Sequence, residues 1–358
     1  MMDWINQLSE TRQFVLFSAM KVTAAFSVLM GIVAYVVLVE RKFCAAVQDR
    51  MGPNRVGIPF TRISLWGLGQ PIADGVKSFL KEDFTPGHVR KAYFWLAPAV
   101  IMIPALLSVA VIPFGSTLGN PDNRMVIADL NVGILYTFGI VSLGVYGIVL
   151  AGYAANSKYP FLGGIRSSAQ MISYEIAMAM SVIPVFMLVA SLNLSDVIRY
   201  QTGGILNWLI FKQPLAFLMF MVAAFAETNR LPFDMPESEQ ELVGGYNTEY
   251  SSMKFAMFFM AEYANMTLAS AMTVTLFLGG WTLPIAGLDQ PAATLWGGLL
   301  HIGIFLGKML VVMLWFIWVR WMLPRFRYDQ LMDLGWRRMV PLALANIMIT
   351  AVVMFWTS

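Results

Sequence analysis

Residues 14–39 read FVLFSAMKVTAAFSVLMGIVAYVVLV, an apolar run whose only charged residue is Lys21. The hydrocarbon core of a bilayer is about 30 Å thick, and about 20 apolar residues cross it as a helix. The run is longer than that, and Lys21 lies near one end, where its side chain can reach the headgroups. We therefore predict a membrane-spanning helix here.

The chain has seven further runs of the same kind. The eight expected spans are 14–39, 93–114, 130–155, 168–191, 211–229, 254–279, 296–320 and 339–357. Composition agrees, because 58% of the 358 residues are hydrophobic and only 13% are charged, whereas soluble domains carry about 25% charged residues. The predicted fold is all-α: a polytopic membrane protein with about eight transmembrane helices, forming a single integral membrane domain over 1–358.

Basic residues gather on one side of the predicted spans. The segments 40–91, 156–166, 227–254 and 320–338 hold nine, two, two and five Lys and Arg, whereas the opposite side holds five. Cytoplasmic loops are enriched in Lys and Arg. We therefore expect these four segments in the cytoplasm and both termini outside.

Few residues could hold a redox cofactor or a metal. Cys44 is the only cysteine, whereas an iron–sulfur cluster normally needs four thiolates. His88 and His301 are the only histidines and lie far apart, which disfavours a haem or zinc site. No dinucleotide fingerprint is present, and a net charge of +3 gives no indication of nucleic acid. We expect no metal, and any redox cofactor should belong to partner subunits.

The loop 40–91 contains a segment, 61–81, that is too polar to span the membrane. One helical stripe of it is apolar and another is charged; the first holds Ile72, Val76, Phe79 and Leu80, the second Asp74, Lys77 and Lys81. This pattern predicts an amphipathic helix in the cytoplasmic interface. From the pattern alone, a membrane anchor without another role is the simpler interpretation.

Three glutamates and one lysine stand out among the ionisable residues of the predicted spans. They are Glu175, Glu227, Glu262 and Lys308. Each such group costs roughly 2.5–3.5 kcal/mol at mid-membrane and usually has a function. A static Lys–Glu pair is the alternative, and for Lys308 both interpretations stay open. One lysine cannot neutralise three carboxylates, so for the glutamates we favour a proton path.

The segment 227–253 is acidic although it lies on the basic side. It contains six acids, Glu227, Asp234, Glu237, Glu239, Glu241 and Glu249, against the single base Arg230. A solvated acidic loop is one interpretation. Because apolar residues such as Phe233 and Leu242 are interspersed among the acids, we favour a loop packed under a partner protein.

Motifs along nearly the whole chain resemble one family. They are ERK at 40–42, QDRMGPNRVG at 48–57, QPIADGVK at 70–77, AQMISYE at 169–175, AETNRLPFD at 226–234, ESEQELVGGYNTEY at 237–250, FFMAEYAN at 258–265 and PRFRYDQLM at 324–332. The chain thus resembles the quinone-site membrane subunit, designated H or 1, of respiratory complex I, the NADH:quinone oxidoreductase.

The resemblance implies a quinone tunnel and a proton path. The first span, the amphipathic helix and the sixth span would frame the tunnel mouth. Residues that would line or brace the tunnel are Glu40, Arg41, Arg50, Asp74, Lys77, Arg230 and Glu249. The proton path would comprise Glu175, Glu227, Glu262, Asp234, Glu237, Glu239 and Glu241.

The resemblance also implies cofactors and partners. The quinone, ubiquinone or menaquinone, would be a non-covalently bound substrate. NADH, FMN and iron–sulfur clusters would belong to partner subunits: hydrophilic redox-arm subunits that carry the terminal cluster, beside small membrane-arm subunits. We expect a bacterial inner membrane ahead of a mitochondrial one. Two alternatives are the homologous subunit of a membrane-bound hydrogenase or other non-NADH dehydrogenase, and a stand-alone ion transporter.

Overall fold

The protein is helical throughout the part of the chain that the structure describes. The structure is a computed structural model, which describes residues 10–57, 66–117, 124–236, 242–285 and 287–357. No strand occurs within these ranges, apart from an isolated bridge between Thr117 and Arg124. The predicted all-α membrane fold is confirmed.

The described helices follow the predicted spans in order. They are α1 (Glu10–Val47), α2 (Gln70–Leu80), α3 (Lys91–Leu107), the 3-10 turn η2 (Ser108–Val111), α4 (Gly133–Ala154), α5 (Lys158–Val189), α6 (Leu194–Tyr200), η3 (Ile205–Asn207), α7 (Leu209–Lys212), α8 (Pro214–Glu227), η4 (Gly245–Asn247), α10 (Ser252–Phe277), α11 (Leu295–Met322), α12 (Tyr328–Asp333), the π-helical turn η5 (Leu334–Met339) and α13 (Val340–Thr357).

Six helical stretches in the described residues are long and apolar enough to cross a membrane. They are Ser18–Val47, Lys91–Val111, Gly133–Ala154, Lys158–Val189, Leu295–Met322 and Tyr328–Trp356. The other two predicted spans are also helices. Of these, α8 is short, with 14 residues, and α10 has 26 residues but carries Ser, Thr, Asn and Glu among its apolar residues. Both therefore differ from an ordinary lipid-facing helix.

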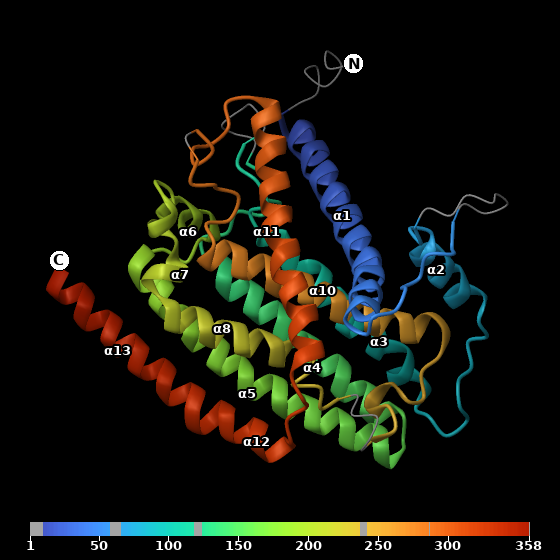
Figure 1. The fold of residues 1–358 in the computed structure, drawn as a ribbon. Coiled ribbons are helices and arrows are strands. Elements are labelled where there is room, and N and C mark those ends of the chain that lie inside the picture. Colours follow the sequence, from blue (N-terminus) through green and yellow to red (C-terminus); the bar gives the residue numbers. More distant parts are fainter. Residues whose placement is uncertain (1–9, 58–65, 118–123, 237–241, 286, 358) are drawn as a thin grey trace.

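The helix α10 lies at the centre of the bundle. It packs against α3, α11, α1 and α8, while α4 joins α3 to α5, and α13 covers α5 from outside. Figure 1 shows α13 along one flank and α1 beside α11. From Ala264 to Phe277, every residue of α10 except Asn265 and Ala269 is buried. A helix buried on all sides can place polar groups inside the protein rather than in lipid.

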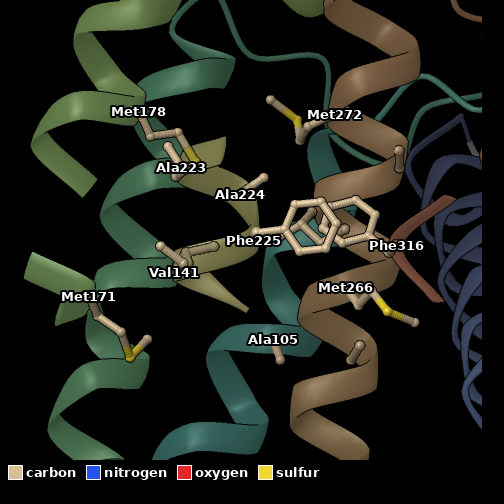
Figure 2. Packing of buried hydrophobic residues seen from close by; sticks show 14 of the residues in the cluster. Ala105, Val141, Met171, Met178, Ala223, Ala224, Phe225, Met266, Met272 and Phe316 are labelled. Carbon is tan, nitrogen blue, oxygen red and sulfur yellow. The ribbon is translucent and has the colours of Figure 1, made fainter. Parts of the chain in front are cut away.

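The core combines aromatic, methionine and alanine side chains with valine, leucine and isoleucine. Figure 2 shows Phe225 of α8 against Phe316 of α11, with ring centroids 4.2 Å apart. Ala223 and Ala224 lie beside Phe225 and are fully buried. Such small residues let neighbouring helices approach closely, so α8 stays in contact with α5 and α10.

Within the described part of the amphipathic segment, 66–81, the helix α2 begins at Gln70. Gly67, with φ +80°, makes the turn before α2, and a Cβ there would lie 1.9 Å from the Pro53 carbonyl oxygen. Pro71 then opens the helix, a position that suits its fixed φ. No residue of α2 is buried, and the apolar stripe that includes Ile72 and Phe79 is at least half exposed. Figure 1 shows α2 at the edge of the bundle, where it contacts α1 and α10.

Two predicted loops are partly helical. The sequence predicts a loop over 156–166, but α5 begins at Lys158, ten residues before the predicted span. Gly163 lies in this extension, where a Cβ would come within 2.9 Å of the Gly245 Cα. The expected loop 320–338 likewise contains α12 and η5. Charged residues in the sequence indicate where a helix leaves the lipid, but the helix can continue beyond that point. The helices are therefore longer here than the spans predicted from hydropathy.

Candidate functional site

Glu40 is a buried carboxylate in the last third of α1, with 6% of its surface exposed. Arg230 Nη1 donates to both of its oxygens at 3.2 Å, and the Tyr263 hydroxyl donates to Oε2 at 2.8 Å. Arg320 of α11 also pairs with it. Burying a carboxylate is costly unless donors replace its water, and Glu40 has three donor side chains.

Arg230 lies in the loop after α8 and connects two acids. Its Nε is 2.8 Å from Glu262 Oε1 on α10, and its guanidinium lies 4.2 Å from the ring centroid of Tyr263. Burial lowers the pKa of Arg230, but the Glu262 and Glu40 carboxylates raise it more, so the net shift is upward. Arg230 is thus a fixed positive charge rather than a proton carrier.

We call the group Glu40, Arg230, Glu262, Tyr263 and Arg320 the buried charge cluster. Its members come from α1, the loop after α8, α10 and α11. Two carboxylates face two guanidiniums, so the cluster is balanced. Losing one member of such a buried set leaves an uncompensated charge, which typically costs several kcal/mol. The cluster therefore fixes the relative positions of four segments.

A second ion pair extends this polar region. Arg325, in the segment after α11, lies 2.6 Å from Asp234 Oδ2. The backbone N–H of Phe326 donates to the Pro232 carbonyl at 3.1 Å. Asp234 is also close enough to Glu262 for their charges to interact. A row of carboxylates thus runs from Glu40 through Glu262 to Asp234.

The loop that carries Arg230 is fastened to α5 by one amide. Gln170 Nε2 donates to the carbonyls of Ala226 at 2.8 Å and Phe233 at 2.7 Å, and to Asn229 Oδ1 at 3.2 Å. Gln170 is fully buried, so water does not compete for these bonds. This contact holds the loop in the shape that presents Arg230 to the two acids.

Glu227 and Glu175 form a separate acidic pair. Glu227 ends α8 and is 5% exposed, and neither of its carboxylate oxygens has a hydrogen-bond partner among the described residues. Glu175 on α5 is half-buried and close enough for electrostatic repulsion. Among the described residues, no ion pair joins either carboxylate to a basic side chain, which sets this pair apart from the balanced buried charge cluster.

A cavity of about 1000 Å³ lies between α1, α2, α10 and α11. We call it the α1–α2–α10 cavity. Its wall is largely apolar, with Met30, Val37, Phe79, Phe259 and Met260 among its side chains. Its polar lining comprises Glu40, Arg41, Cys44, Arg50, Asp74, Ser78, Tyr263 and Arg320. The cavity therefore borders the buried charge cluster, and a long apolar molecule with a polar head would fit it.

Further ionic and polar contacts lie on the α2 side of the cavity. Arg41 Nη1 is 2.8 Å from Asp74 Oδ2, and Gln70 Nε2 donates to Asp74 Oδ1 at 2.9 Å. Arg50 Nε donates to Gln48 Oε1 at 2.7 Å. The first pair joins α1 to α2, so it sets the width of the cavity on this side.

The sequence matches the family described as NADH dehydrogenase over residues 20–351. The chain belongs to this family. A similar protein is the NADH-quinone oxidoreductase H subunit numbered 1 in Cytophaga hutchinsonii, 47% identical over 343 residues, which cover 94% of this chain and 96% of the relative. The H subunit numbered 2 in Koribacter versatilis is 47% identical, with 94% and 97% covered. The H subunit of Flavobacterium johnsoniae is 43% identical, with 95% of each chain covered.

In this member of the NADH dehydrogenase family, the predicted tunnel residues separate into three groups. Glu40, Arg41, Arg50 and Asp74 line the cavity, and Arg230 lies behind it in the buried charge cluster.

The remaining two tunnel residues do not line it. Lys77 is exposed on α2, and Glu249 lies 3.7 Å from His88 Nε2.

The predicted proton-path residues lie in two places. Glu262 and Asp234 belong with the charge cluster, whereas Glu175 and Glu227 form their own pair. Glu237, Glu239 and Glu241 lie outside the described residues.

Two members of the cluster are absent from the sequence-based prediction. Tyr263 follows Glu262 directly within the FFMAEYAN motif. The sequence-based prediction selects charged residues inside apolar spans, so it selects Glu262 and not the neighbouring tyrosine. Arg320 falls among the basic residues of a predicted cytoplasmic loop. Its surroundings, WFIWVRWM, are apolar on both sides, and an arginine in such a context is a signal for a buried partner.

Among the described residues Lys308 forms no Lys–Glu pair, and it does not belong to the buried charge cluster. Its Nζ donates to the carbonyls of Leu278 at 2.6 Å, Gly280 at 3.0 Å and Thr282 at 2.6 Å. It also lies 4.3 Å from the Trp208 ring centroid. These carbonyls follow the C-terminal end of α10, where a positive charge is favourable. The structure thus gives Lys308 a capping role.

Proposed function

We propose that this chain, as a membrane subunit of a proton-translocating NADH:quinone oxidoreductase, binds the quinone in the α1–α2–α10 cavity and begins the proton-coupling path at the buried charge cluster. One observation carries the proposal: a large apolar cavity borders a buried, balanced set of charges. The relatives' names supply the reaction class.

The cavity suits the two ends of a quinone. Apolar side chains of α1 and α10 would hold the isoprenoid tail by burial from water. The apolar face of α2, with Phe79 72% exposed, would rest in the membrane interface and let the tail pass from the bilayer. Polar groups such as Arg41 and Tyr263 would contact the head as it moves past.

Proton coupling would rest on the carboxylates. Reducing a quinone to a quinol consumes two electrons and two protons. This chain would supply no electrons, because the flavin and iron–sulfur clusters would belong to partner subunits. A negative charge arriving near Glu40 would disturb the balance with Arg230 and Arg320. Protonation of Glu262 or Asp234 would then restore neutrality, and Glu227 with Glu175 would continue the path.

Orientation in the membrane follows from the distribution of basic residues. The segments 40–91 and 320–338 carry most of the Lys and Arg outside the spans, which supports an orientation with the cavity side of the bundle toward the cytoplasm. The hydrophilic redox-arm subunits would dock on that side, above the loop that carries Arg230. The membrane would be the bacterial inner membrane.

The cavity can be tested by filling it. Ala34 lines it from α1, and a phenylalanine there would displace a bound tail. Overpacking typically costs 1–3 kcal/mol, so Ala34→Phe should raise the KM for quinone on the order of tenfold. NADH oxidation by a water-soluble acceptor that reacts at the partner subunits should be unchanged.

The matched control is Val39→Phe, on the same helix. Val39 is 37% exposed and does not line the cavity. The control should keep the wild-type KM. If Ala34→Phe in an assembled complex reduced quinone with the wild-type KM, the quinone would have to pass elsewhere and the assignment of the cavity would be wrong.

A further inference from the structure

A second cavity, of about 440 Å³, opens between α1, η2, α10 and α11. We call it the outer groove, and it shares no lining residue with the α1–α2–α10 cavity. Its lining is Met20, Lys21, Ala24, Ala25, Val28, Leu29, Ile32, Val109, Ile112, Phe114, Met125, Thr267, Leu268, Ala271, Ile302, Phe305, Leu306 and Met309. All but Lys21 and Thr267 are apolar, and the Thr267 hydroxyl donates to the Tyr263 carbonyl of its own helix.

The length of the outer groove matches one leaflet of a bilayer. Along α1 it runs from Met20 to Ile32, which at 1.5 Å per residue is about 18 Å. Half of a hydrocarbon core is about 15 Å. Alanines at 24, 25 and 271 keep the groove open where helices otherwise fill the space with side chains. An extended acyl chain therefore fits along it.

Lys21 supplies a positive charge at the outer end. The apolar span of α1 begins at Ser18, so Lys21 lies within about one turn of its outer end, from where the long side chain can reach the lipid headgroups. Its Nζ donates to the Arg124 carbonyl at 2.9 Å, which leaves two N–H donors for a ligand. Among the described residues no ion pair joins Lys21 to a carboxylate, and the Arg124 guanidinium itself pairs with Asp129 at 2.6 Å.

We propose that the outer groove binds one anionic phospholipid, with an acyl chain along the groove and the phosphate at Lys21. The uniform apolar wall selects a hydrocarbon chain, and the single cation at headgroup depth selects a negative head. A quinone has an uncharged head that gains little from an ammonium, and a zwitterionic lipid brings a positive charge of its own close to Lys21. Charge and length together favour phosphatidylglycerol or another anionic lipid.

The test uses the whole complex in lipid nanodiscs. A phosphatidylglycerol with a photoreactive group in its acyl chain is crosslinked, and labelled peptides of this chain are identified. Residues 20–32 and 302–309 should be labelled. Unlabelled phosphatidylglycerol should compete at about fivefold lower concentration than phosphatidylcholine, the factor expected for one lysine near the membrane surface.

Variants separate the head contact from the tail contact. Lys21→Ala should abolish the fivefold preference and Lys21→Arg should restore it. Ala25→Phe should reduce labelling by every lipid. Lys212→Ala is the matched control, because Lys212 lies on α7 against the Tyr200 ring, at 4.6 Å, and not in the groove; it should behave like the wild type.

Three results would overturn the proposal. Equal competition by phosphatidylcholine would show that the groove ignores charge. Stronger competition by a quinone would assign the groove to the substrate. Unchanged preference in the Lys21→Ala complex, with the labelled peptides still at 20–32, would remove the phosphate from Lys21.

Discussion

Replacing Arg230 with alanine should destabilise the protein more than any exposed Arg→Ala change. Arg230 lies 2.8 Å from Glu262 and 3.2 Å from Glu40. At an effective dielectric constant of about 20 these contacts correspond to roughly 6 and 5 kcal/mol of attraction. Desolvation of the charges offsets much of this. Breaking a buried ion pair by removing one partner typically costs about 3–5 kcal/mol, and we expect a loss of that order.

The assay is thermal unfolding of the purified complex, with quinone reduction per assembled complex as the second readout. Arg230→Ala should lower both. Arg327→Ala is the control, because Arg327 and its partner Asp329 are exposed, 75% and 60% by side chain, and it should change neither. Adding Glu262→Gln to Arg230→Ala removes the unpaired carboxylate and should recover part of the stability. No recovery in the double variant would refute the charge-balance argument.

Three further outcomes are expected. Glu262→Gln should leave assembly largely intact and lower proton pumping and quinone reduction together, whereas Glu262→Asp should retain more activity; vesicles at equal complex content measure both, and full pumping by the glutamine variant would assign Glu262 a structural role. Lys308→Met removes the donor from three carbonyls and should lower the unfolding temperature, at about 1–3 kcal/mol per buried acceptor left unsatisfied, with activity per assembled complex unchanged; a stable variant would contradict the capping role. Burial raises the pKa of Asp129, but hydrogen bonds from Asn193 and Arg124 lower it more. The contribution of Asp129 to stability is therefore present above its ordinary pKa of about 3.9 and is lost as pH falls through the lower pKa of the folded state. The stability difference between wild type and Asp129→Asn should shrink below about pH 4, and a constant difference would exclude this linkage.

The helices are predictable because each is encoded locally. A run such as 296–320 contains enough apolar residues to cross a bilayer, and α11 extends only two residues past its predicted end, to Met322. The starts of α5 and α2 are less predictable. Close to these starts, Gly163 packs against Gly245 and Gly67 packs against Pro53. Both contacts join parts of the chain that are separated in sequence, so a hydropathy pattern does not predict them.

The candidate site is predictable in its residue types but not in its grouping. A glutamate amid apolar residues, such as Glu262, signals a buried partner from sequence alone. Which partner it takes is decided by the bundle, which brings α1 and α11 to α10. The family resemblance assigns Glu40 to the quinone tunnel and Glu262 to the proton path, although Arg230 contacts both carboxylates. The pairing of Arg320 with Glu40 is not predicted, because Arg320 stands at the end of an apolar run, where basic residues commonly flank a membrane span.

The amide of Gln170 has a mechanical consequence. It grips the loop at Ala226 and Phe233, and it lies on the same rigid helix as Glu175, five residues or about 7.5 Å along the axis. A displacement of Arg230 that moved this loop would therefore be transmitted to α5, the helix that carries Glu175. The buried charge cluster and the Glu175–Glu227 pair share no ion pair among the described residues, yet the hydrogen bonds of Gln170 connect the segments that carry them.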